Sequence, residues 1–400
     1  TCLRLAPRKD TILWFLDYLK LINFKQIIDA KKSPRKTKGF NNISKYEVIK
    51  TLKSGFVSSV GKDINDFEKG IANYTNSAHA VAMSNGTSAL HISLLANKIR
   101  KKDEVLVPAL TFIATANAIS YCGAIPHFVD SETNSFGINI NKLEIYLRKN
   151  TKLIDNECIN LNTGRRISAI IPVHVFGFIG DMIGLQKLAS EFKLIIIEDA
   201  TEALGSLKKE KHAGTFGKCG CLSFNGNKII TTGGGGALIT NDSNIAKYAR
   251  HLSTTAKLSH EFEYIHDEIG FNYRMPALNA ALGKSQLEKL PNYIISKTKI
   301  RNAYFKNFDK VKGLKFFVGP KDCKPNYWLN ALILDQKNVR FRDLIIIELN
   351  KKGYSCRPIW QLLNSLKPYK NNPSMDLSQA KKLQESIINI PSSPKLGQVI

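Results

Sequence analysis

Short apolar runs alternate with longer segments of helical periodicity between residues 63 and 290 of the chain. Runs such as Leu194–Ile197 contain no alternating polar residues, which is typical of strands buried on both faces of a mainly parallel sheet. The pattern predicts an α/β fold with helices on both faces of one sheet, and ligands of such sheets bind at the carboxyl ends of the strands. The seven predicted strands are Ala80–Met83, Val105–Pro108, Pro126–Asp130, Ala169–Pro172, Leu194–Asp199, Cys221–Asn225 and Ala237–Thr240.

The pattern changes on both sides of this region. Residues 11–24 form a short apolar segment interrupted by Asp17 and Lys20, which predicts an amphipathic helix, and a basic, proline-containing linker follows at residues 31–38. After Leu290, long helical segments with a few strands predict a smaller α+β domain, for example over residues 326–334 and 344–352. We therefore expect an extension at 1–40, a large domain at 41–290 and a small domain at 291–400. The start of the large domain, residues 41–60, is able to pack on the small domain.

Composition excludes two classes of protein. Of the 400 residues, 43% are apolar, which is too many for a disordered chain, and no run of about 18 apolar residues predicts a membrane span. The chain carries 58 Lys and Arg against 33 Asp and Glu, a net charge of +25. This excess fits nucleic acid, a smaller phosphorylated ligand, or a compositional bias spread over the surface. No helix-turn-helix or aromatic-interleaved basic motif supports nucleic acid.

The seven cysteines do not form a recognisable metal site. They are scattered, odd in number and lack the paired spacing of a zinc ribbon, so we expect no metal. Reduced thiols that pack as small apolar residues indicate a cytosolic compartment, and no signal peptide is visible.

Three motifs at predicted strand ends could carry chemistry. After the first strand, a Gly86-Thr87-Ser88 turn enters a helix and could bind phosphate through free N–H groups, or could be an ordinary helix cap. Walker and GxGxxG loops are absent. Glu198, Asp199 and Glu202 end or follow a buried strand, where carboxylates need cationic or hydrogen-bonding partners; Asp199 is a helix cap or the partner of a protonated ring nitrogen.

The third motif places Lys228 between an apolar strand and a run of four glycines. Taken alone, the motif favours a lysine in a surface loop, whereas burial would favour the neutral, nucleophilic amine that Schiff-base chemistry requires. A phosphate turn, an acid for a pyridinium nitrogen and a lysine 29 positions beyond that acid together indicate pyridoxal phosphate.

From about Gly55 to Leu396 the chain resembles the DegT/DnrJ/EryC1/StrS nucleotide-sugar aminotransferases, which are fold type I pyridoxal-phosphate enzymes. Several long motifs occur in the family's order. Three segments, residues 254–257, 327–330 and 389–393, are similar to the LegC branch of the family. The motifs are Phe56–Gly61, Val107–Ala118, Ile171–Gly177, Glu198–Asp199, Ser223–Gly236 and Gly270–Pro276.

The resemblance assigns roles around the cofactor ring. It implies that Lys228 binds the cofactor covalently, that Asp199 pairs with the pyridine nitrogen, and that Phe112 stacks on the ring. Glu202 stands where the wider family has Gln or His, and an acid there is similar to the LegC branch, near the cofactor's hydroxyl.

The resemblance also implies which residues bind the phosphate and that the protein is a homodimer. Gly86, the backbone groups of Thr87 and Ser88, and the Ser223 hydroxyl are implied to bind the phosphate. Asn272 is implied to reach it from the neighbouring subunit of a homodimer with shared active sites.

Other residues are weaker candidates. Lys257, Arg274 and Arg357 could contact a diphosphate or carboxylate, or be solvated surface charges. His174 lies between valines and is interpreted as a hydrogen-bonded structural residue, and Trp328 as a packing residue of the small domain, with base stacking as an alternative.

The implied reaction transfers an amino group, with glutamate as the expected donor, to the 4-keto carbon of a UDP-linked 4-keto-6-deoxy-N-acetylhexosamine for bacillosamine- or legionaminic-type glycans. Alternatives are a GDP-4-keto-6-deoxymannose (perosamine-type) aminotransferase, a cyclitol aminotransferase, and a regulator that contains pyridoxal phosphate without turnover. A related dehydratase branch has His at the position of Lys228 and is disfavoured.

Overall fold

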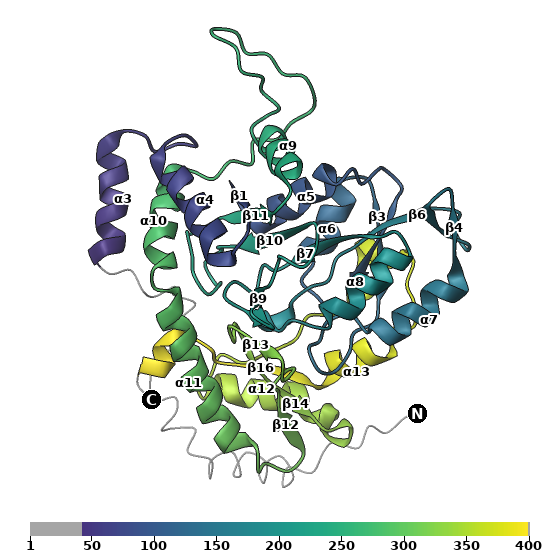
Figure 1. The fold of residues 1–400 in the computed structure, drawn as a ribbon. Coiled ribbons are helices and arrows are strands. Elements are labelled where there is room, and N and C mark those ends of the chain that lie inside the picture. The colour runs from purple at the N-terminus through teal and green to yellow at the C-terminus, as the bar shows by residue number, and fades with distance from the viewer. Residues whose placement is uncertain (1–41, 399–400) are drawn as a thin grey trace.

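The computed structural model describes residues 42–398, and its largest element is a nine-stranded, mainly parallel β-sheet (Figure 1). Seven strands form a continuous path in the order β1-β11-β10-β7-β6-β2-β3, in which β11 runs antiparallel to both of its neighbours. A hairpin of β4 and β5 pairs with β6. The strands are β1 (His79–Met83), β2 (Glu104–Pro108), β3 (Ile125–Val129), β4 (Thr151–Ile154), β5 (Glu157–Asn160), β6 (Arg166–Ile170), β7 (Ile195–Asp199), β10 (Cys219–Ser223) and β11 (Gly236–Thr240).

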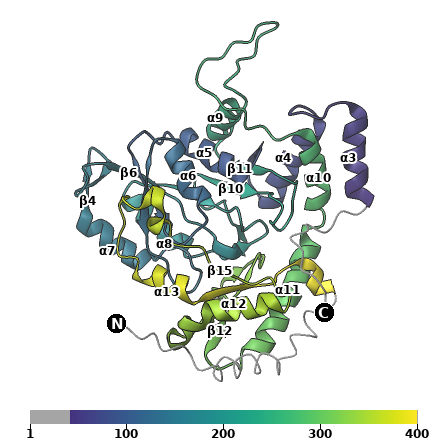
Figure 2. The same ribbon diagram turned by 180° about the vertical axis from the view of Figure 1, so that it is seen from behind.

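Both faces of this sheet are buried. Val81 and Met83 of β1 belong to one hydrophobic core, whereas Ala80 and Ala82 of the same strand belong to another. Because side chains alternate along a strand, apolar residues are needed at every position, which explains the uninterrupted apolar runs. Helices α5 (Gly86–Ala96), α6 (Ala114–Tyr121) and α9 (Ser243–Ser253) contribute to the first core (Figure 2), and α4 (Lys62–Thr75), α7 (Ile140–Asn150), α8 (Met182–Glu191) and α10 (Ala277–Leu287) to the second.

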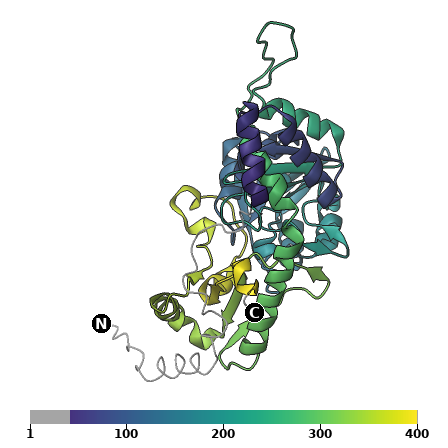
Figure 3. The ribbon, with the colours of Figure 1, turned by 90° about the vertical axis from the view of Figure 1, so that its left-hand side faces the viewer.

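The C-terminal part of the chain forms a second, antiparallel sheet. The long helix α11 (Leu290–Phe308) leads into it, and α11 and the sheet enclose a third hydrophobic core (Figure 3). Four strands in the order β12-β14-β16-β15 build this sheet, and a small three-stranded sheet has the order β13-β8-β9. The elements are β12 (Leu314–Phe316), β14 (Asn330–Leu334), β15 (Arg357–Pro358), β16 (Ile387–Ile390), β8 (Leu207–Lys208), β9 (Lys211–His212), β13 (Cys323–Lys324), α12 (Arg342–Lys351), α13 (Ser378–Ser386), and the 3-10 helices η1 (Val175–Gly177), η2 (Gln336–Phe341), η3 (Leu363–Ser365), η4 (Lys367–Tyr369) and η5 (Pro394–Gln398).

The α/β fold predicted from the apolar runs is confirmed. All seven predicted strands are present, with boundaries that differ by at most three residues. The hairpin of β4 and β5 was not predicted, because three of the four residues of β4 are exposed and give no apolar run. The division into a large and a small domain stays a prediction. The predicted helix at 11–24 and the linker at 31–38 lie outside the described residues.

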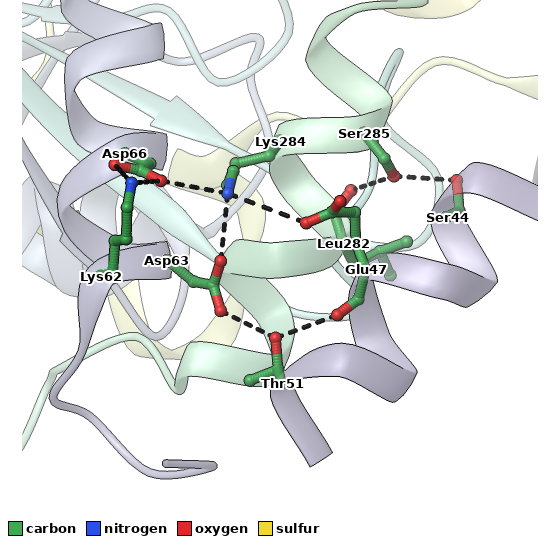
Figure 4. Close-up of polar contacts among 9 residues, drawn as sticks. All are labelled: Ser44, Glu47, Thr51, Lys62, Asp63, Asp66, Leu282, Lys284 and Ser285. Atoms are coloured by element: carbon green, nitrogen blue, oxygen red, sulfur yellow. Dashed lines mark hydrogen bonds and ion pairs between the residues drawn. The ribbon is translucent and has the colours of Figure 1, made fainter. Parts of the chain in front are cut away.

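The first described helix, α3 (Asn42–Ser54), packs on α10. Lys284 of α10 holds it there, because its ammonium lies 3.1 Å from both Asp63 and Asp66 of α4 and 3.8 Å from Glu47 of α3 (Figure 4). Thr51 of α3 also donates a 2.7 Å hydrogen bond to Asp63. These polar contacts join α3 to α10 and α4. The expectation that residues 41–60 pack on the small domain is part of the domain division and stays a prediction.

Within residues 42–398, no helix is both long and apolar enough to cross a membrane. Six cysteines lie in this part of the chain, all are free thiols, and five are buried. These five pack as small apolar core residues, as the scattered spacing predicted.

Candidate active site

Three of the predicted motifs meet at one edge of the large sheet. Strands β1, β10 and β7 run in the same direction and end at this edge, which we call the carboxyl edge. The segment after β1 begins α5, β7 ends at Asp199 and is followed by Glu202, and the segment after β10 carries Lys228. The topology therefore brings a helix N-terminus, two carboxyl groups and an amine together.

Asp199 is buried at the end of β7 and is held by two donors. The Thr115 hydroxyl of α6 donates a 2.7 Å hydrogen bond to Oδ2, and the Thr201 backbone N–H donates to Oδ1 at 3.1 Å. These two donors fix the orientation of the carboxyl group. Asp199 is therefore suited to pair with a protonated nitrogen. The sequence did not identify Thr115, which lies 84 residues from Asp199.

Lys228 lies in the turn after β10, with a side chain that is only 13% exposed. Its Nζ is 3.5 Å from Oε1 of Glu202 and 4.1 Å from the centroid of the Trp328 ring. The alternative interpretation of Lys228 as an exposed surface lysine is wrong. Trp328, interpreted from the sequence as a packing residue, directly contacts this amine.

Glu202 is buried beside Lys228 and accepts a 2.9 Å hydrogen bond from the Phe176 backbone N–H. Burial raises the pKa of Glu202 to about 7, although the Lys228 ammonium and the Phe176 N–H oppose the shift. A carboxyl group with this pKa exchanges its proton near neutral pH. It therefore gives the site a group that can hold or release a proton next to the amine.

The N-terminus of α5 faces Ser223, the last residue of β10. A Cβ atom at Gly86 would lie 3.0 Å from Cβ of Ser223 and 3.1 Å from Cγ2 of Thr201, so a larger residue would push these neighbours away by a few tenths of an ångström. The first N–H groups of a helix have no acceptor within the helix and attract phosphate. The residues around Gly86 therefore fit a phosphate group.

The structure differs from the sequence expectation for the Ser88 backbone N–H. This group donates a 2.8 Å hydrogen bond to Oδ1 of Asn85, which is the N-cap of α5. The helix is capped, but by Asn85 and not by the Thr or Ser of the turn, and the N–H groups of Gly86 and Thr87 are the ones left for a phosphate.

Phe112 precedes α6 at the end of the segment that follows β2, and its ring is 55% exposed. A large ring exposed one turn before Thr115, whose hydroxyl binds Asp199, fits a flat aromatic ligand above this carboxylate.

His174 and Glu198 form a separate buried pair. Nε2 of His174 lies 2.8 Å from Oε2 of Glu198. Glu198 also accepts hydrogen bonds from the backbone N–H groups of Gly214, Phe216 and Gly217. Three hydrogen bonds of Glu198 thus hold the turn before β10, and the fourth holds His174. The geometry agrees with the interpretation of His174 as structural.

The remaining candidates are spread over three places. Asn272 and Arg274 pair with Thr254 and Met83 through isolated β-bridges, which puts this segment beside the end of β1. Lys257 lies in the projecting loop (residues 254–270), which extends away from the sheet above α9, with its ammonium 3.9 Å from the Tyr264 ring centroid (Figure 1). Arg357 is exposed on β15 of the second sheet. The chain therefore brings Asn272 and Arg274, but not Lys257 or Arg357, to the carboxyl edge.

Known proteins are similar to this chain in sequence and in fold. A GDP-perosamine synthase of Caulobacter vibrioides is 34% identical over 359 residues, covering 88% of this chain and 90% of that protein. A GDP-perosamine synthase of Escherichia coli O157:H7 is 35% identical over 354 residues, with coverage of 88% and 90%. The crystal structure of a DegT DnrJ EryC1 StrS aminotransferase from Brucella abortus superimposes with a TM-score of 0.79 at 26% identity, covering 90% of this chain and 94% of that one.

The model of the DegT/DnrJ/EryC1/StrS aminotransferase family matches residues 41–399, which include all the described residues. The amine, carboxyl groups and helix end at the carboxyl edge are the groups that the cofactor of such enzymes needs. The chain therefore belongs to the DegT/DnrJ/EryC1/StrS aminotransferase family of nucleotide-sugar transaminases that depend on pyridoxal phosphate.

Proposed function

We propose that this aminotransferase binds pyridoxal phosphate at Lys228 and transfers the amino group of an amino acid, expected to be glutamate, to the keto carbon of a nucleotide-linked keto sugar. The observation that carries the proposal is the meeting of Lys228, Asp199 and the N-terminus of α5 at the carboxyl edge. When bound, the cofactor supplies an electron sink that stabilises negative charge at the carbon losing its proton.

The chain's own groups hold the cofactor and move the proton. The N–H groups of Gly86 and Thr87, with the Ser223 hydroxyl, would bind the phosphate, and Phe112 would cover a ring face. Asp199, held by two donors, would keep a ring nitrogen protonated. Once its amine is free, Lys228 would take the proton from one carbon and return it to another, because it is the only lysine in this described cluster.

We infer a GDP-linked 4-keto-6-deoxy sugar as the first substrate to test. The support is the similarity to two GDP-perosamine synthases, because the match covers about nine tenths of the length of each. A UDP-linked 4-keto-6-deoxy-N-acetylhexosamine is the second candidate, because Glu202 and the segment 327–330 resemble the LegC branch and both lie at Lys228. Three cations are candidates for the diphosphate, and Arg274 is the one that lies beside the end of β1.

The test is to incubate the protein, pyridoxal phosphate and glutamate with GDP- and UDP-linked 4-keto sugars and identify products by mass and NMR. We expect a 4-amino sugar nucleotide with a GDP-linked substrate. Product from a UDP-linked substrate alone would select the second candidate. If no keto sugar is aminated while glutamate is still converted to 2-oxoglutarate, the substrate class is wrong.

We further propose a homodimer with shared sites. The projecting loop exposes large apolar side chains, with Phe262 77%, Tyr264 81% and Ile269 86% exposed, which marks a surface for another protein. Asn272 follows this loop and would reach the partner's phosphate site. Mixing inactive Lys228→Ala with an impaired Asn272→Ala variant should then restore about a quarter of wild-type activity, since half of randomly mixed dimers hold one intact site. No restoration in exchanging dimers would refute the shared site.

The free thiols of residues 42–398 support the inference of a reducing, cytosolic compartment.

A further inference from the structure

The turn that bears Lys228 is contacted by a segment from the distant C-terminal part of the chain. Trp328 is buried, and its indole Nε1 donates a 2.8 Å hydrogen bond to the backbone oxygen of Asn227, the residue before Lys228. Its ring centroid lies 4.1 Å from Nζ of Lys228. One side chain therefore contacts both the backbone of this turn and the amine itself.

The backbone that carries Trp328 has an unusual conformation. Tyr327 has a φ of 50°, in the left-handed region that residues other than glycine rarely adopt. The buried Asn326 accepts a 2.8 Å hydrogen bond from the Trp328 N–H and donates to the backbone oxygens of Glu202 and Leu204, both at 2.9 Å. Such a conformation persists only where its surroundings fix it, and here they also connect it to Glu202.

Lys297 of α11 also holds the backbone of Tyr327 and Trp328 in place. Its buried ammonium donates to the backbone oxygens of Tyr327 at 3.2 Å, Trp328 at 3.0 Å and Ser392 at 2.6 Å. An ammonium has three donors, and three carbonyl oxygens accept them. Burying a cation is costly unless its hydrogen bonds are made, and an apolar residue could fill the same space without that cost. A specific requirement for those three carbonyl contacts would explain a lysine here.

We propose that Lys297 is a positioning residue of the transamination reaction: it fixes the backbone of Tyr327 and Trp328, and the Trp328 ring thereby confines the Lys228 amine. This inference rests on the proposed role of Lys228 as the reacting lysine. Lys297 acts through Trp328, since its own hydrogen bonds go to the backbone oxygens of Tyr327, Trp328 and Ser392 and not to Lys228. A confined amine matters because a displacement of about 1 Å at a reacting group can cost up to roughly 100-fold in rate.

The first readout needs neither cofactor nor substrate. The labelling rate of Lys228 by acetic anhydride is measured in the apoprotein by peptide mass spectrometry. Trp328→Leu should label about fivefold faster, because the ring covers the amine, and Lys297→Met should label about threefold faster. Trp328→Phe retains a ring and should stay within twofold of wild type. Lys299→Met, an exposed position on the same helix, is the matched control and should not change the rate.

The second readout is the glutamate half-reaction of the holoenzyme. Lys297→Met and Trp328→Leu should each lower its rate about tenfold, with KM for glutamate within twofold of wild type. If Lys297 acts through Trp328, the double variant should be no slower than Trp328→Leu alone.

Labelling within twofold of wild type in Trp328→Leu overturns the proposal by itself, even if Lys297→Met does not fold. Fully additive effects in the double variant overturn the route through Trp328. A wild-type protein that does not convert glutamate refutes the proposed function instead. The labelling rates of the apoprotein still test whether Trp328 and Lys297 confine the Lys228 amine, because they need no substrate.

Discussion

Replacing Glu202 with glutamine tests the electrostatics of the cluster beside Lys228. Glutamine has the same shape and its amide oxygen can still accept the Phe176 N–H, but it cannot ionise. In the folded protein burial raises the pKa of Glu202 from 4.5 to about 7, whereas in the unfolded chain the group titrates near its usual value. The variant should therefore differ from wild type in a way that depends on pH.

The sign follows from the raised pKa in the folded state. Glu202 contributes its full stability below about pH 4.5, and this contribution is lost as the pH rises through 7, because the unfolded chain ionises first. A difference between 4.5 and about 7 corresponds to about 3 kcal/mol. Relative to wild type, Glu202→Gln should become more stable by up to that amount between pH 4.5 and pH 8.

The assay is thermal unfolding of the apoprotein at pH 5, 6, 7 and 8. The midpoint of Glu202→Gln minus that of wild type should rise by a few degrees across this range. The exposed Glu261→Gln serves as the matched control and should follow wild type at every pH. A midpoint difference that is constant from pH 5 to pH 8 would refute the buried, proton-exchanging carboxyl group.

Three further substitutions test other contacts. Thr115→Val removes the hydroxyl that binds Asp199 and should weaken cofactor binding roughly tenfold, measured by titrating apoprotein with pyridoxal phosphate, while Thr115→Ser should bind normally. Glu198→Gln leaves buried donors without a charged acceptor and should lower stability by about 3 kcal/mol in thermal unfolding; an unchanged midpoint would contradict its structural role. Lys284→Met should cost about 1 kcal/mol and speed amide exchange in α3 without altering turnover, and slower turnover would contradict a purely structural cluster.

The sequence predicted the large sheet because its strands are buried on both faces and therefore read as unbroken apolar runs. It also predicted where chemistry would gather, since Asp199 and Lys228 each follow such a run. It could not predict the Trp328 contact, because that residue lies 100 positions from Lys228, in a segment whose unusual backbone is fixed by Lys297 and Asn326.

The local sequence also does not show which N–H groups at the N-terminus of α5 are free to bind a phosphate. A Gly-Thr-Ser turn offers several N–H groups to a phosphate, and only the three-dimensional position of Asn85 shows that the Ser88 N–H is already bound. Likewise, the sequence does not show whether the Glu202 carboxyl group is exposed to solvent or buried against Lys228. That depends on other segments of the chain, including η1, which pack over it in the folded protein.

The most direct test of the account is a single-turnover measurement of glutamate conversion to 2-oxoglutarate by protein loaded with pyridoxal phosphate, in wild type and in Lys228→Ala. The account predicts one equivalent of 2-oxoglutarate per site in wild type and a rate lower by at least about a thousandfold in the variant, together with loss of the absorbance of lysine-bound cofactor. Normal conversion by Lys228→Ala would contradict the role of Lys228, and no conversion by a wild-type protein that retains the cofactor would favour a regulator without turnover.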